Sequence, residues 1–277
     1  MRYALLALTL LAISADRTSD REALLAADRS LSDKTAAAGL MQGFLPALTD
    51  DAIYLYPGAP LLRGGGQIRS FLASSDSLMR PEWSPAFADV SADGRLGYSY
   101  GWTRAGGTRG KYLACWRKAS GTWRITAYAM TRPIAVPDSV TPRPPAATLS
   151  DQVRGRANPD DLMYADSAFA ALSVTSGAKL AFLTYAADNA ISFGGGVQMT
   201  EGREAIGAAF DGFPAGAVLE WRPVAAHIAP SGDLGCTVGE ARIASLNHYS
   251  KYLTIWRRQP DRTWKFVADG GNARPAP

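Results

Sequence analysis

The pattern of apolar and polar positions predicts helices followed by strands, and this order occurs twice along the chain. Apolar residues at helical spacing follow the polar segment 19–22, as at the start of a helix. Further helices are expected near 41–48 and over 67–73. Runs rich in β-branched and aromatic residues then predict strands at 52–56, 83–90, 96–103, 111–118 and 122–130. The same order returns between a helix near 161–171 and a last strand that ends at Ala268.

The repetition can be followed residue by residue. Residues 111–117, Lys-Tyr-Leu-Ala-Cys-Trp-Arg, return as residues 251–257, Lys-Tyr-Leu-Thr-Ile-Trp-Arg, so five of seven positions match at a separation of 140. Further matches lie upstream at a separation of 138, as between Trp83 and Trp221. Solenoid proteins repeat every ~20 to 50 residues, so the longer period indicates two copies of one globular domain.

One strand in each copy indicates how the two copies are arranged. Tyr112 and Trp116 lie on one face of the strand at 111–118, and Leu113 and Cys115 lie on the other. A strand that is apolar on both faces is covered on both. Helices would cover one face, and the sheet of the other copy would cover the second. We therefore expect α+β domains that pair as an internal pseudo-dimer.

Length and composition fit two soluble globular domains, since 277 residues contain 47% hydrophobic and 19% charged residues. Residues 1–15 contain one arginine, an apolar run and a small-residue end, which predicts a signal peptide and a secreted or periplasmic protein. The alternative is that this run begins an N-terminal helix. The first domain is expected over 16–133, a proline-rich linker over 134–157 and the second domain over 158–277.

Charge and cysteine content exclude some classes of partner. The net charge is +4 and the arginines are scattered, whereas a nucleic-acid-binding surface would cluster them. We expect no nucleic-acid partner, no membrane association after signal cleavage, and a monomer in solution. Cys115 and Cys236 could form a disulfide in an exported protein, but they occupy non-equivalent positions in the two copies. Two buried free thiols are therefore expected.

The order of short motifs resembles a known superfamily. Asp-Asp-Ala-Ile at 50–53, Gly-x-x-x-Ile at 64–68, Trp-x-Pro at 83–85 and Gly-Lys-Tyr-Leu-x-x-Trp-Arg at 110–117 resemble the nuclear transport factor 2-like (NTF2-like), or ketosteroid-isomerase-like, domains. Bacterial SnoaL-like and uncharacterised domains are the most similar branch. The resemblance covers nearly the whole mature chain, once per copy. It implies two cone-shaped α+β-barrel domains, each with helices packed on a curved antiparallel sheet around an apolar pocket.

Candidate acid–base residues lie in the second copy. Glu240 stands where the first copy has Trp102, and Asp269 where it has Tyr128. If Glu240 faces the cone together with Tyr185, a proton-transfer site results. The favoured alternative is that Glu240 pairs with Arg242 on an exposed strand and that Asp269 caps the C-terminal turn at 270–272. The aspartate and tyrosine set of ketosteroid isomerase cannot be placed in either copy.

Aromatic residues are candidates for lining a ligand pocket. A flat apolar molecule could be held by aromatic rings whose polar groups fix its orientation. They could equally fill the interface between the domains. The candidates are Tyr56, Tyr100, Trp102 and Tyr128 in the first copy, and Tyr185 and Trp221 in the second.

Neither a metal nor a cofactor is expected. The acidic pair at 50–51 has no further Asp, Glu or His nearby in sequence, whereas calcium needs about six oxygen ligands. The glycine runs 64–66 and 194–196 lack the lysine of a phosphate-binding loop. We expect an exported protein that binds a small apolar molecule. The alternative is a cofactor-free isomerase, cyclase or dehydratase that acts in the second domain.

Overall fold

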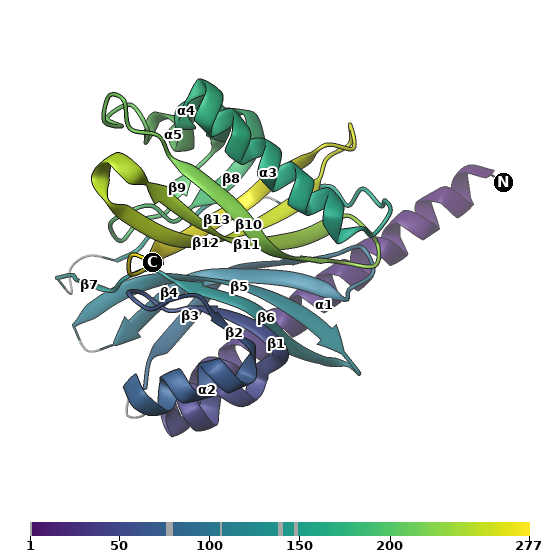
Figure 1. The fold of residues 1–277 in the computed structure, drawn as a ribbon. Coiled ribbons are helices and arrows are strands. Elements are labelled where there is room, and N and C mark those ends of the chain that lie inside the picture. The colour runs from purple at the N-terminus through teal and green to yellow at the C-terminus, as the bar shows by residue number, and fades with distance from the viewer. Residues whose placement is uncertain (1, 76–79, 106, 138–140, 147–148) are drawn as a thin grey trace.

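The computed structural model describes the backbone of residues 2–75, 80–105, 107–137, 141–146 and 149–277, and the side chains of these residues except 2–16 and 75. Residues 138–140 and 147–148 of the predicted linker, and Met1 of the predicted signal peptide, lie outside the described residues. Two sheets lie against each other in the middle of the molecule, and helices cover the outer face of each (Figure 1).

The first domain contains three helical segments ahead of its main strands, as the sequence predicts. The segment expected as a helix near 41–48 is a π-helix and a 3-10 helix instead. The elements are α1 (Arg2–Gly39), η1 (Leu40–Phe44), η2 (Leu45–Ala47), β1 (Leu48–Leu55), β2 (Leu62–Arg63), α2 (Gly64–Ser75), β3 (Glu82–Val90), β4 (Leu96–Ala105), β5 (Thr108–Ala119), β6 (Thr122–Met130) and β7 (Ile134–Ala135).

The second domain repeats this order after the linker. Its elements are α3 (Pro159–Ser176), α4 (Ala178–Tyr185), β8 (Ala186–Ser192), β9 (Thr200–Glu201), α5 (Arg203–Ala208), β10 (Glu220–Ile228), β11 (Leu234–Ile243), η3 (Ala244–Leu246), β12 (His248–Arg258) and β13 (Trp264–Ala273). Asn158 caps α3, because its side chain accepts a hydrogen bond from the Asp160 amide at 3.2 Å. The expected α+β class with two domains is confirmed, and the expected domain bounds stay predictions.

The sheets are mixed rather than purely antiparallel, which corrects one detail of the expected fold. Four long strands run antiparallel in the orders β3-β4-β5-β6 and β10-β11-β12-β13. The first strand of each domain then joins the outer edge of the last one in parallel, β1 beside β6 and β8 beside β13. Almost the whole domain connects each parallel pair, so the long connection that parallel pairing needs is present.

The predicted signal segment forms the first part of α1, which is continuous from Arg2 to Gly39. Figure 1 shows this end of the helix reaching away from the rest of the molecule. Export and cleavage near Ala15 stay predictions. Within the part of the chain that the structure describes, no helix combines the length and the apolar character that crossing a membrane requires.

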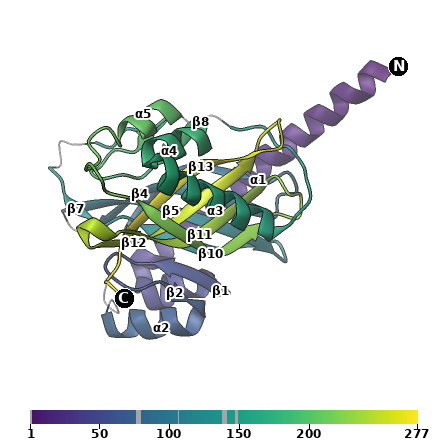
Figure 2. The same cartoon turned by 45° about the horizontal axis from the view of Figure 1, so that its top comes forward.

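The strands are apolar on both faces because each sheet contacts helices on one side and the other sheet on the other. In Figure 2, α3, α4 and α5 lie over one sheet, while α2 lies beyond the opposite sheet. Tyr100 of β4 packs edge-on against Phe193 of the second domain, with ring centroids 5.9 Å apart. Further apolar side chains of the layer between the sheets include Tyr98, Leu113, Cys115, Cys236, Leu253 and Ile255. The expected pseudo-dimer is therefore confirmed.

The expectation of two free thiols is wrong, because Cys115 and Cys236 form a disulfide between the domains. The pseudo-two-fold arrangement gives the physical reason. Across a two-fold interface, position i of one copy contacts position j of the other, so contacting residues are usually non-equivalent. Cys115 is equivalent to Ile255, and Cys236 is equivalent to Tyr98. Cys115 and Cys236 can therefore meet across the interface because they occupy non-equivalent positions in the two copies.

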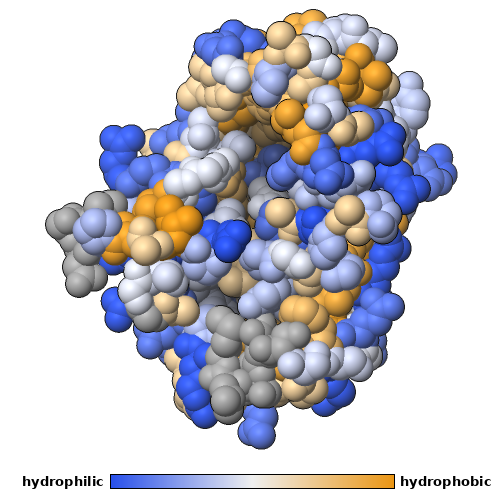
Figure 3. Space-filling view, turned by 60° about the vertical axis from the view of Figure 1, so that its left-hand side comes forward, coloured by the Kyte–Doolittle hydropathy of each residue, from blue (hydrophilic) through white to orange (hydrophobic). Residues whose placement is uncertain are grey.

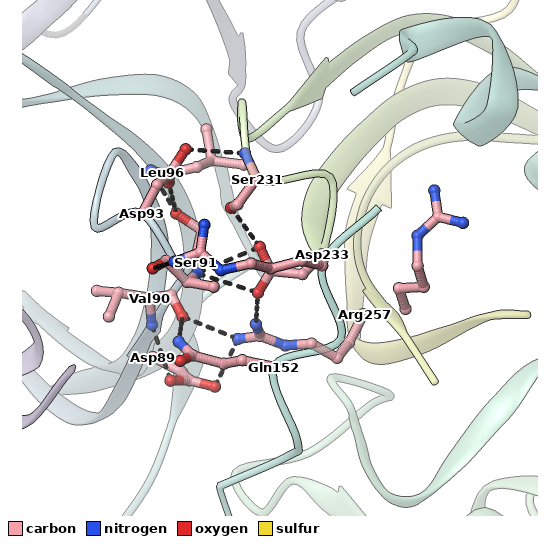
Figure 4. A network of polar contacts seen from close by, with 12 residues as sticks. Asp89, Val90, Ser91, Asp93, Leu96, Gln152, Ser231, Asp233 and Arg257 are labelled. Carbon is pink, nitrogen blue, oxygen red and sulfur yellow. Dashed lines mark hydrogen bonds and ion pairs between the residues drawn. The ribbon is translucent and has the colours of Figure 1, made fainter. Parts of the chain in front are cut away.

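A buried ion-pair network also joins the domains at one edge of the interface (Figure 4). The guanidinium of Arg257 lies 2.7 Å from the carboxylate of Asp233 and 2.6 Å from that of Asp89. All three side chains are buried. Arg257 also donates to the carbonyl of Val90, which accepts a second hydrogen bond from Gln152 of the linker. Both domains and the linker therefore meet at one arginine.

Two equivalent lysines form a symmetric pair of contacts between the domains. The Lys111 ammonium donates to the carbonyl of Gly194 in the second domain at 2.8 Å, and the Lys251 ammonium donates to that of Tyr56 in the first at 2.8 Å. Both lysines are buried, and burial lowers the pKa of each to about 8. These lysines hold the loop after β8 and the loop after β1 against the opposite domain.

Candidate functional site

A buried carboxylate with two aromatic donors occurs at the same place in both domains. In the first domain, Asp28 of α1 accepts hydrogen bonds from the indole of Trp83 at 2.7 Å and the phenol of Tyr112 at 2.6 Å. In the second, Asp166 of α3 accepts them from Trp221 and Tyr252, at 2.9 and 3.0 Å. The trio fastens the long helix of each domain to its sheet.

The space beside this trio is filled in the first domain. Tyr128 of β6 stacks on Tyr112 with ring centroids 5.6 Å apart and an angle of 12° between the rings. Tyr54 of β1 lies next to Tyr128, and Met130 follows on the same strand face. Tyr54, Tyr128 and Met130 are all buried. Aromatic side chains therefore occupy the interior of the first cone.

The same positions carry small or polar side chains in the second domain. The strand registers make Tyr54 equivalent to Ser192 and Tyr128 equivalent to Asp269, because β1 pairs with β6 as β8 pairs with β13. Met130 pairs with Tyr112 as Gly271 pairs with Tyr252. The result is a cavity of about 180 Å³ whose lining includes Phe169, Phe182, Trp221, Tyr252, Thr254, Asp269, Gly270 and Gly271.

A second, larger cavity adjoins the first at the mouth of the second cone. It has a volume of about 540 Å³ and shares Phe182, Asp269 and residues 270–271 with the inner cavity. Figure 3 views the molecule from the side on which β7 and the C-terminal segment lie, and shows a recess in its upper half with apolar side chains at the rim. Asp269 therefore lies at the junction of an inner cavity and an open mouth.

The two carboxyl groups of the second cone have raised pKa values. Burial raises the pKa of Asp166 to about 6, against the opposing effect of its hydrogen bonds. Burial likewise raises the pKa of Asp269 to about 6, and the charge of Asp166 adds to this. The Thr254 hydroxyl donates to Asp269 at 2.6 Å. Asp166 is fully enclosed, whereas Asp269 is half-buried and lines both cavities, so Asp269 is the carboxyl that a ligand can reach.

The structure places Glu240 outside the cone. It shares a strand face with Cys236, which contacts the first domain, so its side chain points away from Asp269 and Tyr185. The side chain is 24% exposed and lies 3.5 Å from the guanidinium of Arg222 and 3.4 Å from that of Arg274. Glu240 thus belongs to a surface ion-pair cluster. The expected partner, Arg242, is wrong, because Arg242 pairs with Glu220 instead.

The candidate aromatic residues divide between pocket, core and interface. Trp221 lines the inner cavity beside Asp269, and Tyr185 stacks on Phe169 of the cavity wall at 5.0 Å. Tyr128 fills the first cone, while Tyr56 packs on the ring of Phe71 near its mouth. The remaining two candidates, Tyr100 and Trp102, lie in the interface, where the Trp102 indole donates to the Val197 carbonyl at 3.1 Å.

Sequence reasoning missed several residues of the cavity, above all Asp166, Tyr252 and Thr254. A signal for Asp166 was present, since Asp28 and Asp166 recur at the separation of 138 that also relates Trp83 and Trp221. Asp269 does not cap a turn, because β13 continues through it to Ala273. Among the described residues, no group of three His, Cys, Asp or Glu side chains is placed to hold a metal ion.

Comparison with known proteins yields similar structures but no match to a family model or to a curated protein. The chain is similar to an NTF2-like protein of unknown function from Pseudomonas putida (12% identity, TM-score 0.35, 41% of this chain and 84% of that one). It is also similar to an NTF2-like protein with a cystatin-like fold from Novosphingobium aromaticivorans (19% identity, TM-score 0.34, 41% of this chain and 80% of that one). A third similar structure is a ketosteroid isomerase-like protein from Erwinia carotovora atroseptica. It has 10% identity and a TM-score of 0.36, and the match covers 43% of this chain and 97% of that one.

Proposed function

We propose that the second domain binds a small apolar molecule that carries a hydrogen-bonding group, and that this group contacts Asp269. The observation that carries the proposal is the difference between two equivalent interiors. Where the first cone holds Tyr128 against Tyr112, the second leaves a cavity with Asp269 on its wall. An empty space lined by Phe169, Phe182 and Trp221 next to a reachable polar group is the usual composition of a small-molecule site.

Isothermal titration calorimetry with a panel of flat aryl ketones, alcohols and acids tests the proposal. Asp269→Tyr reproduces the first domain's side chain at this position and should fill the cavity, so it should abolish binding while the protein stays folded. Asp269→Asn keeps the shape and should weaken binding by about tenfold, as expected for loss of one hydrogen bond to a charged group.

Glu240→Gln is the matched control, because it removes a carboxylate from the same sheet on the face outside the cone. The Glu240→Gln variant should bind the compounds of the panel with the same affinity as the unaltered protein. If Asp269→Tyr binds the panel as well as the unaltered protein does, the ligand does not occupy this cavity and the proposal fails.

A second candidate function is cofactor-free acid–base catalysis, such as isomerisation or dehydration, with Asp269 as the proton-transfer group. The raised pKa of Asp269, about 6, favours it, because a group that titrates near neutral pH can both accept and release a proton. If Asp269 acts as a base, turnover should rise with pH through about 6. Asp269→Asn should then abolish turnover and reduce binding far less.

Export is proposed together with binding. Its support is the sequence of residues 1–15, with an arginine, an apolar run and a small-residue end. Mass spectrometry of the protein purified from its own host should find an N-terminus near Asp16. An intact Met1 in the cytoplasmic fraction would contradict the prediction.

A further inference from the structure

We propose that the ligand of the second domain carries a carboxylate, and that Arg132 of the first domain binds this carboxylate at the mouth of the cavity together with His248. The inference rests on the proposed function and adds the chemical class of the ligand. It also assigns the first domain a direct part in recognition, as the wall that supplies the cationic group.

The mouth is built from both domains. The larger cavity is lined on one side by Thr131, Arg132 and Ile134, which follow β6 of the first domain. The other side consists of second-domain residues, including His248 at the start of β12. A ligand in this cavity would therefore touch both domains, and the second cone alone would lack one wall.

Arg132 and His248 have free polar groups at this mouth. Among the described residues, neither side chain takes part in a hydrogen bond or an ion pair. The hollow beside Glu240 differs in this respect, because Arg222 and Arg242 are already paired with glutamates there. An arginine without a carboxylate partner can offer its planar fork of donors to a carboxylate of the ligand.

The internal repeat allows the mouths of the two cones to be compared position by position. The equivalent of Arg132 at the mouth of the first cone is Ala273, since Met130 corresponds to Gly271 two residues earlier. The equivalent of His248 is Thr108, since each is the first residue of its strand and pairs with the last residue of the preceding one. Both cation-capable side chains thus occur at the open cone and are replaced by uncharged ones at the filled cone.

The two mouths also differ in the size of a side chain. Tyr56 of the first domain corresponds to Gly194 of the second, as Tyr54 corresponds to Ser192. A side chain added at Gly194 would meet almost nothing within 4 Å, so the small residue leaves open space and is not required by close packing. The second mouth therefore has less bulk than the first at this position.

The two ends of the site fix the orientation of the ligand. A carboxylate next to Asp269 would be repelled when Asp269 is ionised, whereas a carboxylate at Arg132 is attracted. Rings of Phe182, Phe193 and Phe210 line the space between the mouth and the cone. The apolar body of the ligand would lie along these rings and direct its far end, with any neutral polar group, toward Asp269.

Calorimetry with matched pairs of aryl carboxylic acids and their primary amides, beginning with 2-naphthoic acid and 2-naphthamide, tests the inference on the full chain. The acid should bind about 10- to 100-fold more tightly than the amide, as expected for a charge-assisted bond. Arg132→Ala should remove this preference and leave the affinity for the amide unchanged. Arg132→Lys should restore part of it, and His248→Ala should reduce it less.

Arg95→Ala is the matched control, since Arg95 is an exposed arginine of the same domain in the turn before β4. It should retain the full preference for acids. Equal binding of acid and amide, or an unchanged preference in Arg132→Ala, overturns the inference. Binding of neutral aryl ketones without any acid would overturn it and leave the proposed function standing, whereas failure of the whole panel would overturn both.

Discussion

The two domains share a buried scaffold and differ in what they place beside it. Asp28 with Trp83 and Tyr112 is matched by Asp166 with its own tryptophan and tyrosine, at nearly the same distances. Yet one neighbouring position holds Tyr128 and its equivalent holds Asp269. The scaffold is thus a structural feature common to both copies, and the site is what remains when the bulky neighbours are absent.

The interface shows the same combination of shared and divergent contacts. Lys111 and Lys251 make equivalent contacts with the opposite domain. The equivalent residues Arg117 and Arg257 make different contacts. Arg257 is buried between two carboxylates, whereas the side chain of Arg117 is exposed and pairs with Asp51. One pair of equivalent cations therefore makes the same contacts in both copies, and the other pair does not.

The largest expected effect separates the two domains from each other. The disulfide closes a loop with a sequence separation of 121 residues, and the chain-entropy model gives about 5 kcal/mol for a loop of this length. Replacing both cysteines by alanine should lower the free energy of unfolding by up to this amount. Urea denaturation followed by circular dichroism should then resolve two transitions, one for each domain. An unchanged single transition would contradict this prediction.

The next test concerns a feature in which the domains should behave alike. Trp116 and Trp256 are buried, and their indoles donate to Ser99 and Thr237, each at 2.8 Å. Replacing either tryptophan by alanine should cost about 3 to 5 kcal/mol, because each leaves a large cavity in its own core. The two losses, measured by urea denaturation, should be similar. A loss at one site alone would show that the two cores are not equivalent.

A smaller loss is expected when the first cone is given the residue of the second. Tyr128→Asp removes a stacked ring and places a carboxyl beside Asp28, which should cost about 2 to 4 kcal/mol. The converse change, Asp269→Tyr, should not destabilise, since it fills an existing cavity. Thermal denaturation of both variants measures the difference. Equal destabilisation would mean that the second cone has no room for the ring.

The smallest expected effect is the pH dependence of the second domain. Asp166 and Asp269 lose their protons near pH 6 in the folded protein and near pH 3.8 when unfolded. The folded state therefore binds more protons between these values, so the free energy of unfolding should fall as the pH rises from 4 to 7. Asp269→Asn should flatten this slope, and Glu240→Gln should not. Urea denaturation across this pH range measures both.

The sequence predicted the architecture well because hydrophobic alternation and the internal repeat report on it directly. The strand at 111–118 is apolar on both faces, and both faces are indeed covered. Alternation places Glu240 and Cys236 on one face but does not say whether that face lines the cone or the interface. The disulfide of Cys236 with the first domain shows that this face, and therefore Glu240, lies on the interface side of the sheet.

The candidate site was partly predictable for the same reason. Asp269 was found because it replaces an aromatic residue in a repeated strand. Asp166 was not, although it is repeated, because a buried aspartate in a helix is indistinguishable from a solvated one until its partners are known. Arg132 lies where one domain contacts the mouth of the other, and such a contact depends on how the two sheets are aligned.

The disulfide has a consequence for how separate molecules recognise each other. Two first copies would set Cys115 against the partner molecule's equivalent of Cys236, which is Tyr98, and two second copies would set Cys236 against Ile255. The covalent bond can therefore form only between unlike copies, and the same holds for Arg257 with Asp89, whose equivalent is His227. A chain with two self-complementary sheets could link into open polymers. Contacts that only unlike copies can make disfavour the pairing of two first copies or of two second copies.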